Sequence, residues 1–251
     1  EGYRPGGLNR FCSVGNEADY GGQGRDDATG ARCDFVPDFL TSLEVGVKGS
    51  LMDGRMVFNA AAFMQAWDDF QFSRLDTSIS PVTLTYNIGQ AKSDGIEADF
   101  TAMLAENWTL SGAFSYIEAE LSEDYYQSSG LDAPTAASGT TLPRVPKTKW
   151  NLSSRYELAS NWFAQASYIY TGSSYNNLYD GGTIPTKRFK QDDYQIMNVA
   201  VGKDMDTWTA ELYVRNLFDE RGEVFRNAVN WDARIMTNRP RTLGFRVGLK
   251  F

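Results

Sequence analysis

The residues best suited to binding chemistry are aromatic and basic side chains in the irregular segments of the sequence. Tyrosine and tryptophan offer rigid contact area, and arginine presents a planar fork of donors to carboxylates and other anions. Residues of this kind are often simply solvated, because few residues dominate binding. The candidate ligand contacts are Tyr125, Tyr126, Tyr175, Tyr179, Arg226, Trp231 and Arg234.

Catalytic chemistry is poorly supported, because the sequence contains no histidine. Histidine is the commonest general base and metal ligand, so we expect no enzyme activity, no metal site and no cofactor. Aspartates in the irregular segments offer oxygen ligands to Ca²⁺, but clustered acids in such segments are more often solvated. These aspartates are Asp26, Asp27, Asp124, Asp180, Asp192 and Asp193.

Two cysteines, Cys12 and Cys33, flank a stretch rich in glycine and aspartate. Their spacing suits a disulfide that closes a loop, and such bonds persist in the periplasm and at cell surfaces. The alternative is a pair of reduced thiols in a cytosolic protein. Zinc binding is disfavoured, since neither histidine nor a second cysteine pair is present.

The composition limits the classes of partner and of membrane segment. The net charge of -8 argues against nucleic-acid binding. No run of about 18 apolar residues occurs, so a transmembrane helix is not expected. A membrane β-barrel passes this test undetected because its strands alternate. The 14% of aromatic residues fits the aromatic girdles of such a barrel, and also fits a β-sandwich.

The final residues form the most regular strand pattern in the sequence. Phe245, Val247 and Leu249 alternate with Arg246 and Lys250, which is the period of two typical of a β-strand. Apolar residues toward lipid and polar residues toward a lumen are what a barrel strand requires. Charged residues expected to line the lumen are Glu44, Lys48, Glu97, Arg155, Glu157, Glu211, Arg215, Arg246 and Lys250.

Similar alternation predicts about ten strands joined by short and long connections in turn. Short turns are expected at 52–55, 105–107, 159–161 and 204–206, and the long connections include 121–145, 175–190 and 218–238. This asymmetry is typical of outer-membrane barrels, whereas a β-sandwich has shorter strands. The strands are predicted at 39–51, 56–75, 82–104 with interruptions at Gly89 and Gly95, 108–120, 147–158, 162–174, 192–203, 207–217 and 243–251, with a partial one at the start.

Three tryptophans, Trp108, Trp162 and Trp208, each follow a short turn. An amphipathic ring at one level of several strands favours a girdle at the membrane interface. The alternative is packing in a soluble core.

Several segments, taken in order, resemble those of TonB-dependent outer-membrane receptors. They are GYRPG at 2–6, EVGVKG within 39–49, NIGQAKSDGIEA at 87–98, YVRNLFDER at 213–221 and RPRTLG followed by the terminal strand at 239–251. Each segment is weak alone, but together they extend over nearly the whole sequence.

The resemblance implies a transmembrane antiparallel β-barrel of about 22 strands with an N-terminal plug, of which residues 1–251 supply about ten C-terminal strands. The abrupt start favours a fragment that lacks the plug and the segment that binds TonB. Because an open sheet leaves unpaired edges in lipid, we expect other chains, or the rest of a longer molecule, to complete the barrel. Phe251 fits the terminal assembly signal, although Phe245 stands where a signal glycine is expected.

The implied function is TonB-energised uptake of a scarce ligand across the Gram-negative outer membrane, most simply a ferric siderophore or a similar chelate. Expected partners are the TonB complex through the missing N-terminal region, outer-membrane lipid and lipopolysaccharide, and a small-molecule or oligosaccharide ligand. Haem is disfavoured because histidine is absent. The alternatives are a passive porin-like channel, which would have a signal peptide but no plug upstream of Glu1, an outer-membrane barrel enzyme, and a soluble β-sandwich binding module.

Overall fold

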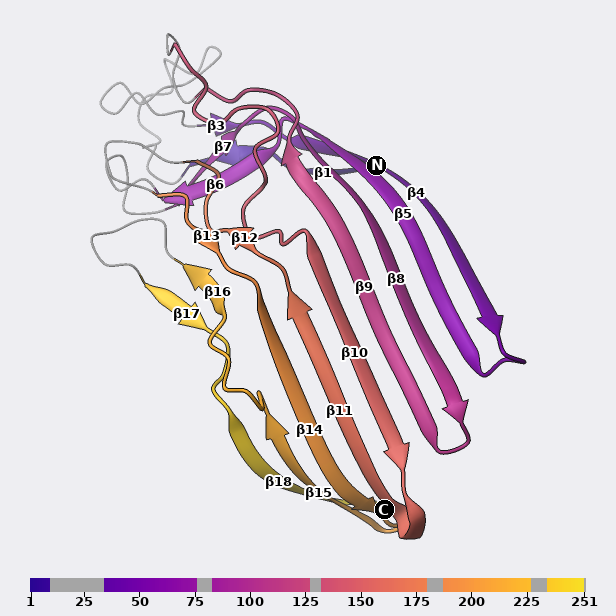
Figure 1. The fold of residues 1–251 in the computed structure, drawn as a ribbon. Coiled ribbons are helices and arrows are strands. Elements are labelled where there is room, and N and C mark those ends of the chain that lie inside the picture. Colours follow the sequence, from indigo (N-terminus) through magenta and orange to yellow (C-terminus); the bar gives the residue numbers. More distant parts are fainter. Residues whose placement is uncertain (10–33, 76–82, 127–131, 180–186, 227–233, 251) are drawn as a thin grey trace.

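The protein is built on one curved antiparallel sheet of ten strands (Figure 1). The computed structural model describes residues 1–9, 34–75, 83–126, 132–179, 187–226 and 234–250. Among these residues, no helix is both long and apolar enough to cross a membrane. The strands, in sheet order, are β1 (Gly2–Arg4), β4 (Asp38–Leu51), β5 (Met56–Asp68), β8 (Ala91–Ala105), β9 (Trp108–Leu121), β10 (Thr148–Glu157), β11 (Trp162–Thr171), β14 (Tyr194–Asp204), β15 (Trp208–Arg215) and β18 (Thr242–Leu249).

Short connections gather at one end of the sheet, here called the turn end. Gly54 has a φ of +84° in the β4–β5 turn, a conformation that favours glycine. A single 3₁₀ turn, Ala159–Asn161, joins β10 to β11. Asn107 in the β8–β9 turn donates its side-chain amide to the Glu157 carbonyl, 3.1 Å away, which ties adjacent turns together. All four predicted short turns are confirmed.

The opposite end, here called the loop end, carries short hairpins above the main sheet (Figure 1). The predicted strand 56–75 is interrupted where Asp69 adopts a φ of +54°, so its second half joins a separate hairpin. The predicted break at Gly89 is confirmed by its φ of +86°, whereas Gly95 lies inside the continuous β8. The predicted strand 162–174 stops at Thr171. The hairpins pair β2 (Gly7–Leu8) with β3 (Asp34–Phe35), β6 (Gln71–Leu75) with β7 (Thr83–Asn87), β12 (Ser174–Tyr175) with β13 (Lys190–Gln191), and β16 (Glu223–Arg226) with β17 (Ile235–Thr237).

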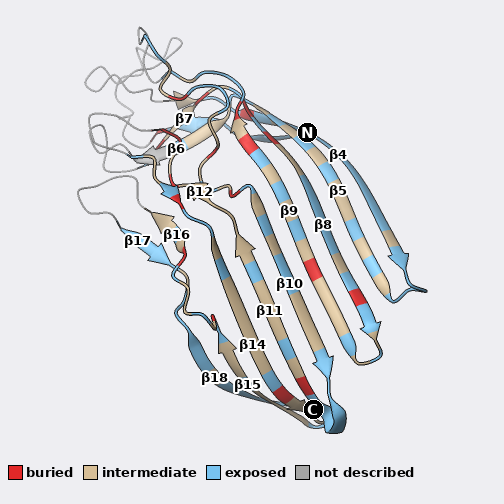
Figure 2. Ribbon diagram, viewed as in Figure 1, coloured by how far each residue is buried: buried red, intermediate tan, exposed pale blue. Residues whose placement is uncertain are grey.

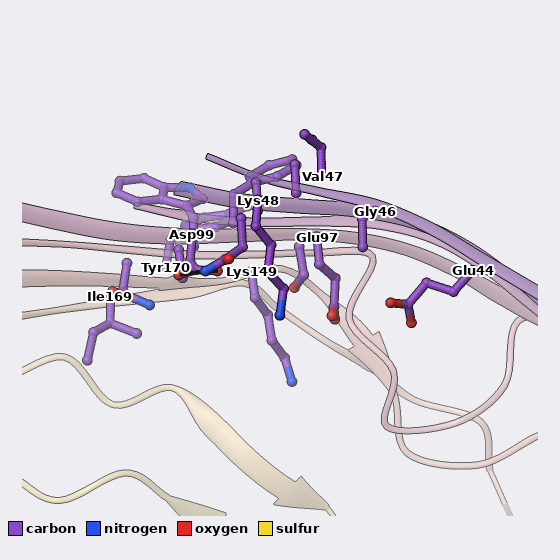
Figure 3. A pocket seen from close by; sticks show the side chains of 18 of the residues that line it. Glu44, Gly46, Val47, Lys48, Glu97, Asp99, Lys149, Ile169 and Tyr170 are labelled. Atoms are coloured by element: carbon purple, nitrogen blue, oxygen red, sulfur yellow. Dashed lines mark hydrogen bonds between the residues drawn. The ribbon is translucent and has the colours of Figure 1, made fainter. Parts of the chain in front are cut away.

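The two faces of the main sheet differ in polarity. Val47 points away from the side on which Glu44, Lys48 and Glu97 lie (Figure 3), and Val45 is 71% exposed. The long strands hold few buried residues, as Figure 2 shows. The chain therefore has an apolar convex face and a polar concave face, as barrel strands require.

Glycines in the sheet are covered by aromatic rings directly across the ladder. Phe58 pairs with Gly49 and Phe63 pairs with Gly95. These rings occupy opposite faces, which explains why the two phenylalanines have opposite parity in one strand. Each ring fills the gap left by its glycine, a device that pins strand register. Further pairs are Phe100 with Gly112, Phe163 with Gly202, and Tyr213 with Gly244.

Gly95→Ala should destabilise the protein by about 1–3 kcal/mol, a typical result of overpacking. An added Cβ would lie 2.7 Å from the Phe63 ring and 2.7 Å from the Tyr116 carbonyl oxygen, which is fixed by the sheet. Thermal unfolding of the purified protein in detergent measures the change. Gly248→Ala is the control, since its Cβ would meet nothing within 4 Å. Equal stability of the two variants would contradict the proposed role of close packing.

Candidate functional site

A small hydrophobic core closes over the concave face at the loop end. Ala91, Ala119 and Leu121 lie on the concave side of β8 and β9, and residues of the long connections pack against them. The long connections therefore fold inward and cover the concave face at its loop end. We call this cluster the loop-end core; it comprises Ile88, Ala91, Ala119, Leu121, Ala136, Leu142, Leu178 and Tyr179.

The candidate ligand residues occupy different environments. Tyr179 is only 4% exposed and belongs to the loop-end core. The Tyr125 ring lies 6.0 Å from it, between centroids, and packs against the same core, so both serve packing. Tyr126 is exposed, as is Arg234 just before β17.

Some predicted residues lie outside the part of the chain that the structure describes. They are Trp231, Cys12, Cys33, Phe251, Asp26, Asp27 and Asp180. Within the described ranges, no group of three or more acidic or cysteine side chains is placed to hold a metal ion.

Tyr175 and Arg226 belong to a set of stacked arginines and rings that joins three loop segments. The guanidinium carbon of Arg188 lies 3.5 Å from the centroid of the Tyr175 ring. Arg144 lies over Phe225 at 4.8 Å, and Arg226 over Phe189 at 4.6 Å. We call this set the arginine–aromatic cluster; it comprises Arg144, Tyr175, Arg188, Phe189, Phe225 and Arg226.

Polar contacts hold the arginine–aromatic cluster together. The Arg144 backbone N–H donates to the Tyr175 carbonyl at 2.7 Å, and Gln191 donates from its side chain to the Glu223 carbonyl at 3.2 Å. Arg226 forms an ion pair with Glu223 at 3.2 Å, while its buried Nε has no hydrogen-bond partner. Three arginines thus lie together, and Glu223 forms an ion pair with one of them, Arg226.

Four members of this cluster were not among the ligand contacts predicted from the sequence: Arg144, Arg188, Phe189 and Phe225. The adjacent pairs Arg188-Phe189 and Phe225-Arg226 were the available signal. An aromatic residue next to an arginine in each of two long connections allows reciprocal stacking, which is favourable by about 0.5–2 kcal/mol per contact.

The concave face carries a cavity of about 980 Å³ below the loop end (Figure 3). Charged side chains from β4, β8 and β10 line it, with Lys48 and Lys149 opposing Glu44, Glu97 and Asp99. The Asn59 amide donates to both carboxylate oxygens of Asp99, at 3.0 and 3.1 Å. The cavity is therefore wet and mixed in charge, which suits contact with polar protein or solute.

Farther along the concave face, charges pair locally, both between neighbouring strands and within one strand. Arg246 lies 3.4 Å from Glu211 on the neighbouring strand. Arg155 lies 2.7 Å from Glu157, and its guanidinium carbon is 3.9 Å from the centroid of the Phe163 ring. These residues, predicted from the alternation to face a lumen, all lie on the polar face.

The three predicted girdle tryptophans begin β9, β11 and β15 at the turn end, on the convex side. Trp108 donates from Nε1 to the Ser154 hydroxyl at 2.9 Å. The Lys203 ammonium lies 5.8 Å from the centroid of the Trp162 ring. The rings thus occupy one end of the apolar face with polar groups beside them.

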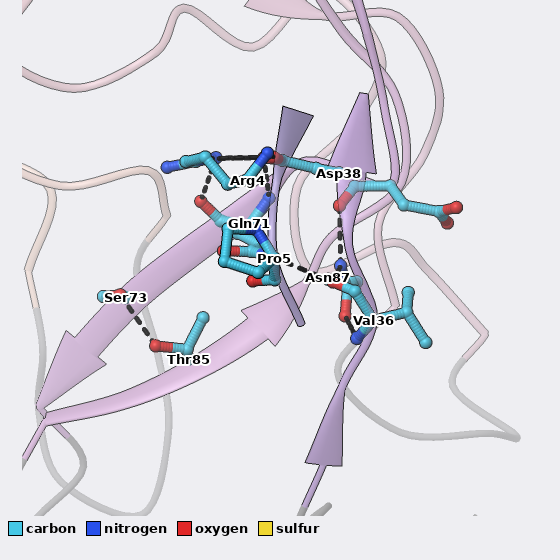
Figure 4. A network of polar contacts seen from close by, with 9 residues as sticks. Arg4, Pro5, Val36, Asp38, Gln71, Ser73, Thr85 and Asn87 are labelled. Atoms are coloured by element: carbon cyan, nitrogen blue, oxygen red, sulfur yellow. Dashed lines mark hydrogen bonds and ion pairs between the residues drawn. The ribbon is translucent and has the colours of Figure 1, made fainter. Parts of the chain in front are cut away.

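A polar network fixes β1 and the β6–β7 hairpin to β4 at the loop end (Figure 4). Asp38 is only 1% exposed and accepts hydrogen bonds from the Arg4 guanidinium and from the backbone N–H groups of Arg4 and Gln71. The Gln71 side chain donates to the Val36 carbonyl at 2.9 Å, and Asn87 donates to the same oxygen at 3.0 Å. The network therefore ties β1, β4 and the β6–β7 hairpin into one unit.

A second polar motif ends β15. Asn216 is buried and its amide donates to the carbonyls of Glu220 and Arg239, each at 2.9 Å. Asp219 accepts from the Arg241 backbone N–H at 2.7 Å. That hydrogen bond, followed by the Arg221 side chain, holds the pKa of the Asp219 carboxyl below its usual range. Both residues have positive φ, so short polar side chains are needed where the chain leaves the sheet.

Comparison with known proteins finds relatives that all belong to one kind of receptor. The family model described as "TonB dependent receptor-like, beta-barrel" matches residues 1–217. The metal-pseudopaline receptor CntO of Pseudomonas aeruginosa is 29% identical over 192 residues, covering 74% of this chain and 24% of the relative. The probable TonB-dependent siderophore receptor PiuA of Acinetobacter baumannii is 24% identical over 187 residues, with the same coverage.

Solved structures show the same fold. The ferric yersiniabactin uptake receptor FyuA from Yersinia pestis aligns over 100% of this chain and 34% of its own, with a TM-score of 0.69 and 20% identity. The ferric-catecholate import receptor Fiu from E. coli covers 85% of this chain and 27% of its own, with a TM-score of 0.63 and 21% identity. The chain spans about a quarter of the length of the curated relatives it matches.

Asp38→Ala should release β1 and the β6–β7 hairpin, because the Gln71 N–H and the Arg4 guanidinium lose a buried acceptor. Leaving such donors unsatisfied costs about 1–3 kcal/mol. Hydrogen exchange should accelerate in 2–4 and 71–75 while β14 and β15 keep their protection. Asp38→Asn, which retains one acceptor, is the milder control. Unchanged exchange in Asp38→Ala would refute the anchoring role.

The Asp219 contact should weaken in acid. Because its pKa is lower in the folded protein, its stabilising effect is complete above the unfolded value of about 3.9 and is lost as the pH falls through the folded pKa. The protection of the Arg241 amide, which is its exchange rate relative to the intrinsic rate at each pH, should fall as the pH is lowered from 6. In Asp219→Asn the same profile should lose this acid-dependent step. A step of equal size in both proteins would assign the titration to another group.

Proposed function

Because the chain belongs to the TonB-dependent receptor β-barrel family, we propose that it contributes wall and capture loops to a receptor for an anionic metal chelate. It is a protein of the Gram-negative outer membrane, as its family is. The family fold is the reason to expect a receptor barrel, and the side chains at the loop end are the reason to expect an anionic ligand.

The arginine–aromatic cluster is the observation that carries the proposal. Arginine side chains from three loop segments lie together at the mouth of the sheet. Each guanidinium carbon lies over a ring, so that less rotamer entropy remains to be lost when an anion binds. Carboxylate, catecholate and hydroxamate chelates expose anionic oxygens that suit such forks of donors. The names of the relatives, a metal-pseudopaline receptor and a siderophore receptor, point to the same ligand class.

The loop-end core favours a receptor over a passive channel. Its inward-folded loops cover part of the concave face, whereas a diffusion pore needs an open polar path. Energised transport would use TonB, bound by a region outside this chain. The charged cavity of Figure 3 offers mixed charges to whatever fills the lumen, and the tryptophans at the turn end would sit at the membrane interface. The Cys12–Cys33 disulfide and the Phe251 assembly signal stay predictions.

Replacing Arg144, Arg188 and Arg226 together with glutamine should weaken chelate binding at least tenfold. Hydrogen bonds to charged groups contribute about 1.5–3 kcal/mol each. The measurement is titration of the complete receptor with a panel of ferric catecholate, hydroxamate and carboxylate chelates. Lys190→Gln, an exposed lysine on the neighbouring β13, is the matched control and should bind normally. Equal affinity of the triple variant and the wild type would remove the cluster from the ligand site.

Uptake of the bound chelate should stop in cells that lack TonB. Uptake that continues there, at a rate proportional to external concentration, would instead establish the passive channel.

A further inference from the structure

A β-bulge in the β16–β17 hairpin brings together two charged side chains that a regular strand would separate. The register of β16 against β17 shifts between Glu223 and Phe225, which leaves Val224 as an extra residue. Side chains three residues apart point to opposite faces of a regular strand. Because the extra residue resets the alternation, Glu223 and Arg226 lie on one side and form an ion pair at 3.2 Å. Re-aiming a side chain in this way is a common use of bulges beside functional sites.

The ion pair leaves one polar atom of each partner unsatisfied. A carboxylate binds arginine best through two parallel hydrogen bonds, one to each nitrogen of an edge. Glu223 Oε1 lies 3.2 Å from Arg226 Nη2. Glu223 Oε2 and Arg226 Nε, the other nitrogen of that edge, are both buried and have no hydrogen-bond partner among the described residues. Unpaired buried atoms are unfavourable, so a better-placed carboxylate can replace Glu223 at this edge.

The neighbouring contacts fix Arg226 and the strand, but not the Glu223 carboxylate. The guanidinium carbon of Arg226 lies 4.6 Å from the centroid of the Phe189 ring, which holds that side chain in place. The Gln191 side chain donates to the backbone carbonyl of Glu223 at 3.2 Å, so the strand stays anchored when the Glu223 side chain rotates. In the part of the chain that the structure describes, the ion pair is the one polar contact of this carboxylate. It can therefore move aside without unpairing the hairpin.

We propose that Glu223 is an internal competitor, which occupies the Nε–Nη2 edge of Arg226 until a free carboxylate of the chelate displaces it. This role rests on the proposed function of the arginine–aromatic cluster. Metal-bound oxygens of a ferric chelate share their charge with the metal, whereas a carboxylate outside the coordination sphere keeps its charge and two free oxygens. Such a group bonds both nitrogens of the edge, which Glu223 does not. The ligand class is thereby narrowed to chelates that carry a free carboxylate.

Titration of the complete receptor tests the proposal, with ferric catecholate, hydroxamate and carboxylate chelates made with a pendant carboxylate and as the methyl ester of that group. Glu223→Gln keeps the size of the side chain but weakens the competitor. It should tighten binding of the acid by about fivefold, the effect of losing one partly exposed ion pair, and leave binding of the ester unchanged. A gain in affinity cannot come from a misfolded protein.

Two further variants separate local competition from general repulsion. In the Arg226→Gln background, Glu223→Gln should have no effect, because the edge for which the two carboxylates compete is gone. Asp192→Asn removes the same charge from an exposed side chain next to Gln191, and it should bind both forms of the chelate as the wild type does.

The proposal is overturned if no chelate with a free carboxylate binds, or if Glu223→Gln lowers or does not change the affinity for the acid. It is also overturned if the ester gains as much as the acid, if Asp192→Asn gives the same gain, or if the gain persists without Arg226. Normal binding by the triple variant of Arg144, Arg188 and Arg226 would exclude the cluster and this role together. Weakened binding by the triple variant, without a gain in Glu223→Gln, would exclude the role of Glu223 alone.

Discussion

The structure depends on the pairing of backbone groups between neighbouring strands. In a bilayer, each unsatisfied N–H or C=O costs several kcal/mol, so the ladder must satisfy them all within the sheet. Ten strands of this chain pair in one antiparallel sheet, in which the edge strands β1 and β18 each have a partner on one side only. Because the ladder fixes which residues stand opposite one another, it also decides which side chains form the convex face and which form the concave face.

This arrangement leaves no conventional core between two layers. The convex side chains remain exposed until lipid covers them, and the concave charges satisfy one another across strands, as Glu211 and Arg246 do. Packing specificity is concentrated in cross-strand pairs of a ring with a glycine, such as Phe100 with Gly112. A wall built in this way tolerates much variation in its exposed residues, but little at the paired glycines.

Burial and polar networks are concentrated instead at the loop end. Asp38 and Asn216 are buried there and satisfy backbone groups of several segments. Such networks hold in place the irregular backbone between the short hairpins of the long connections, where no ladder satisfies the backbone groups. Rigid loops are in turn what allows the arginine–aromatic cluster to hold its charges in a fixed arrangement before a ligand arrives.

Alternation and turn chemistry, which are local properties of the chain, predicted the main strands, the short turns, the polarity of the two faces and the family. They did not predict the break at Asp69, after which Gln71–Leu75 joins a separate hairpin. The sequence also located Tyr175 and Arg226, but not their neighbours. The burial of Tyr179 and the stacking of Arg144 on Phe225 could be seen only in the folded protein. Those outcomes depend on contacts between residues far apart in the chain, and no local pattern encodes which distant segments meet.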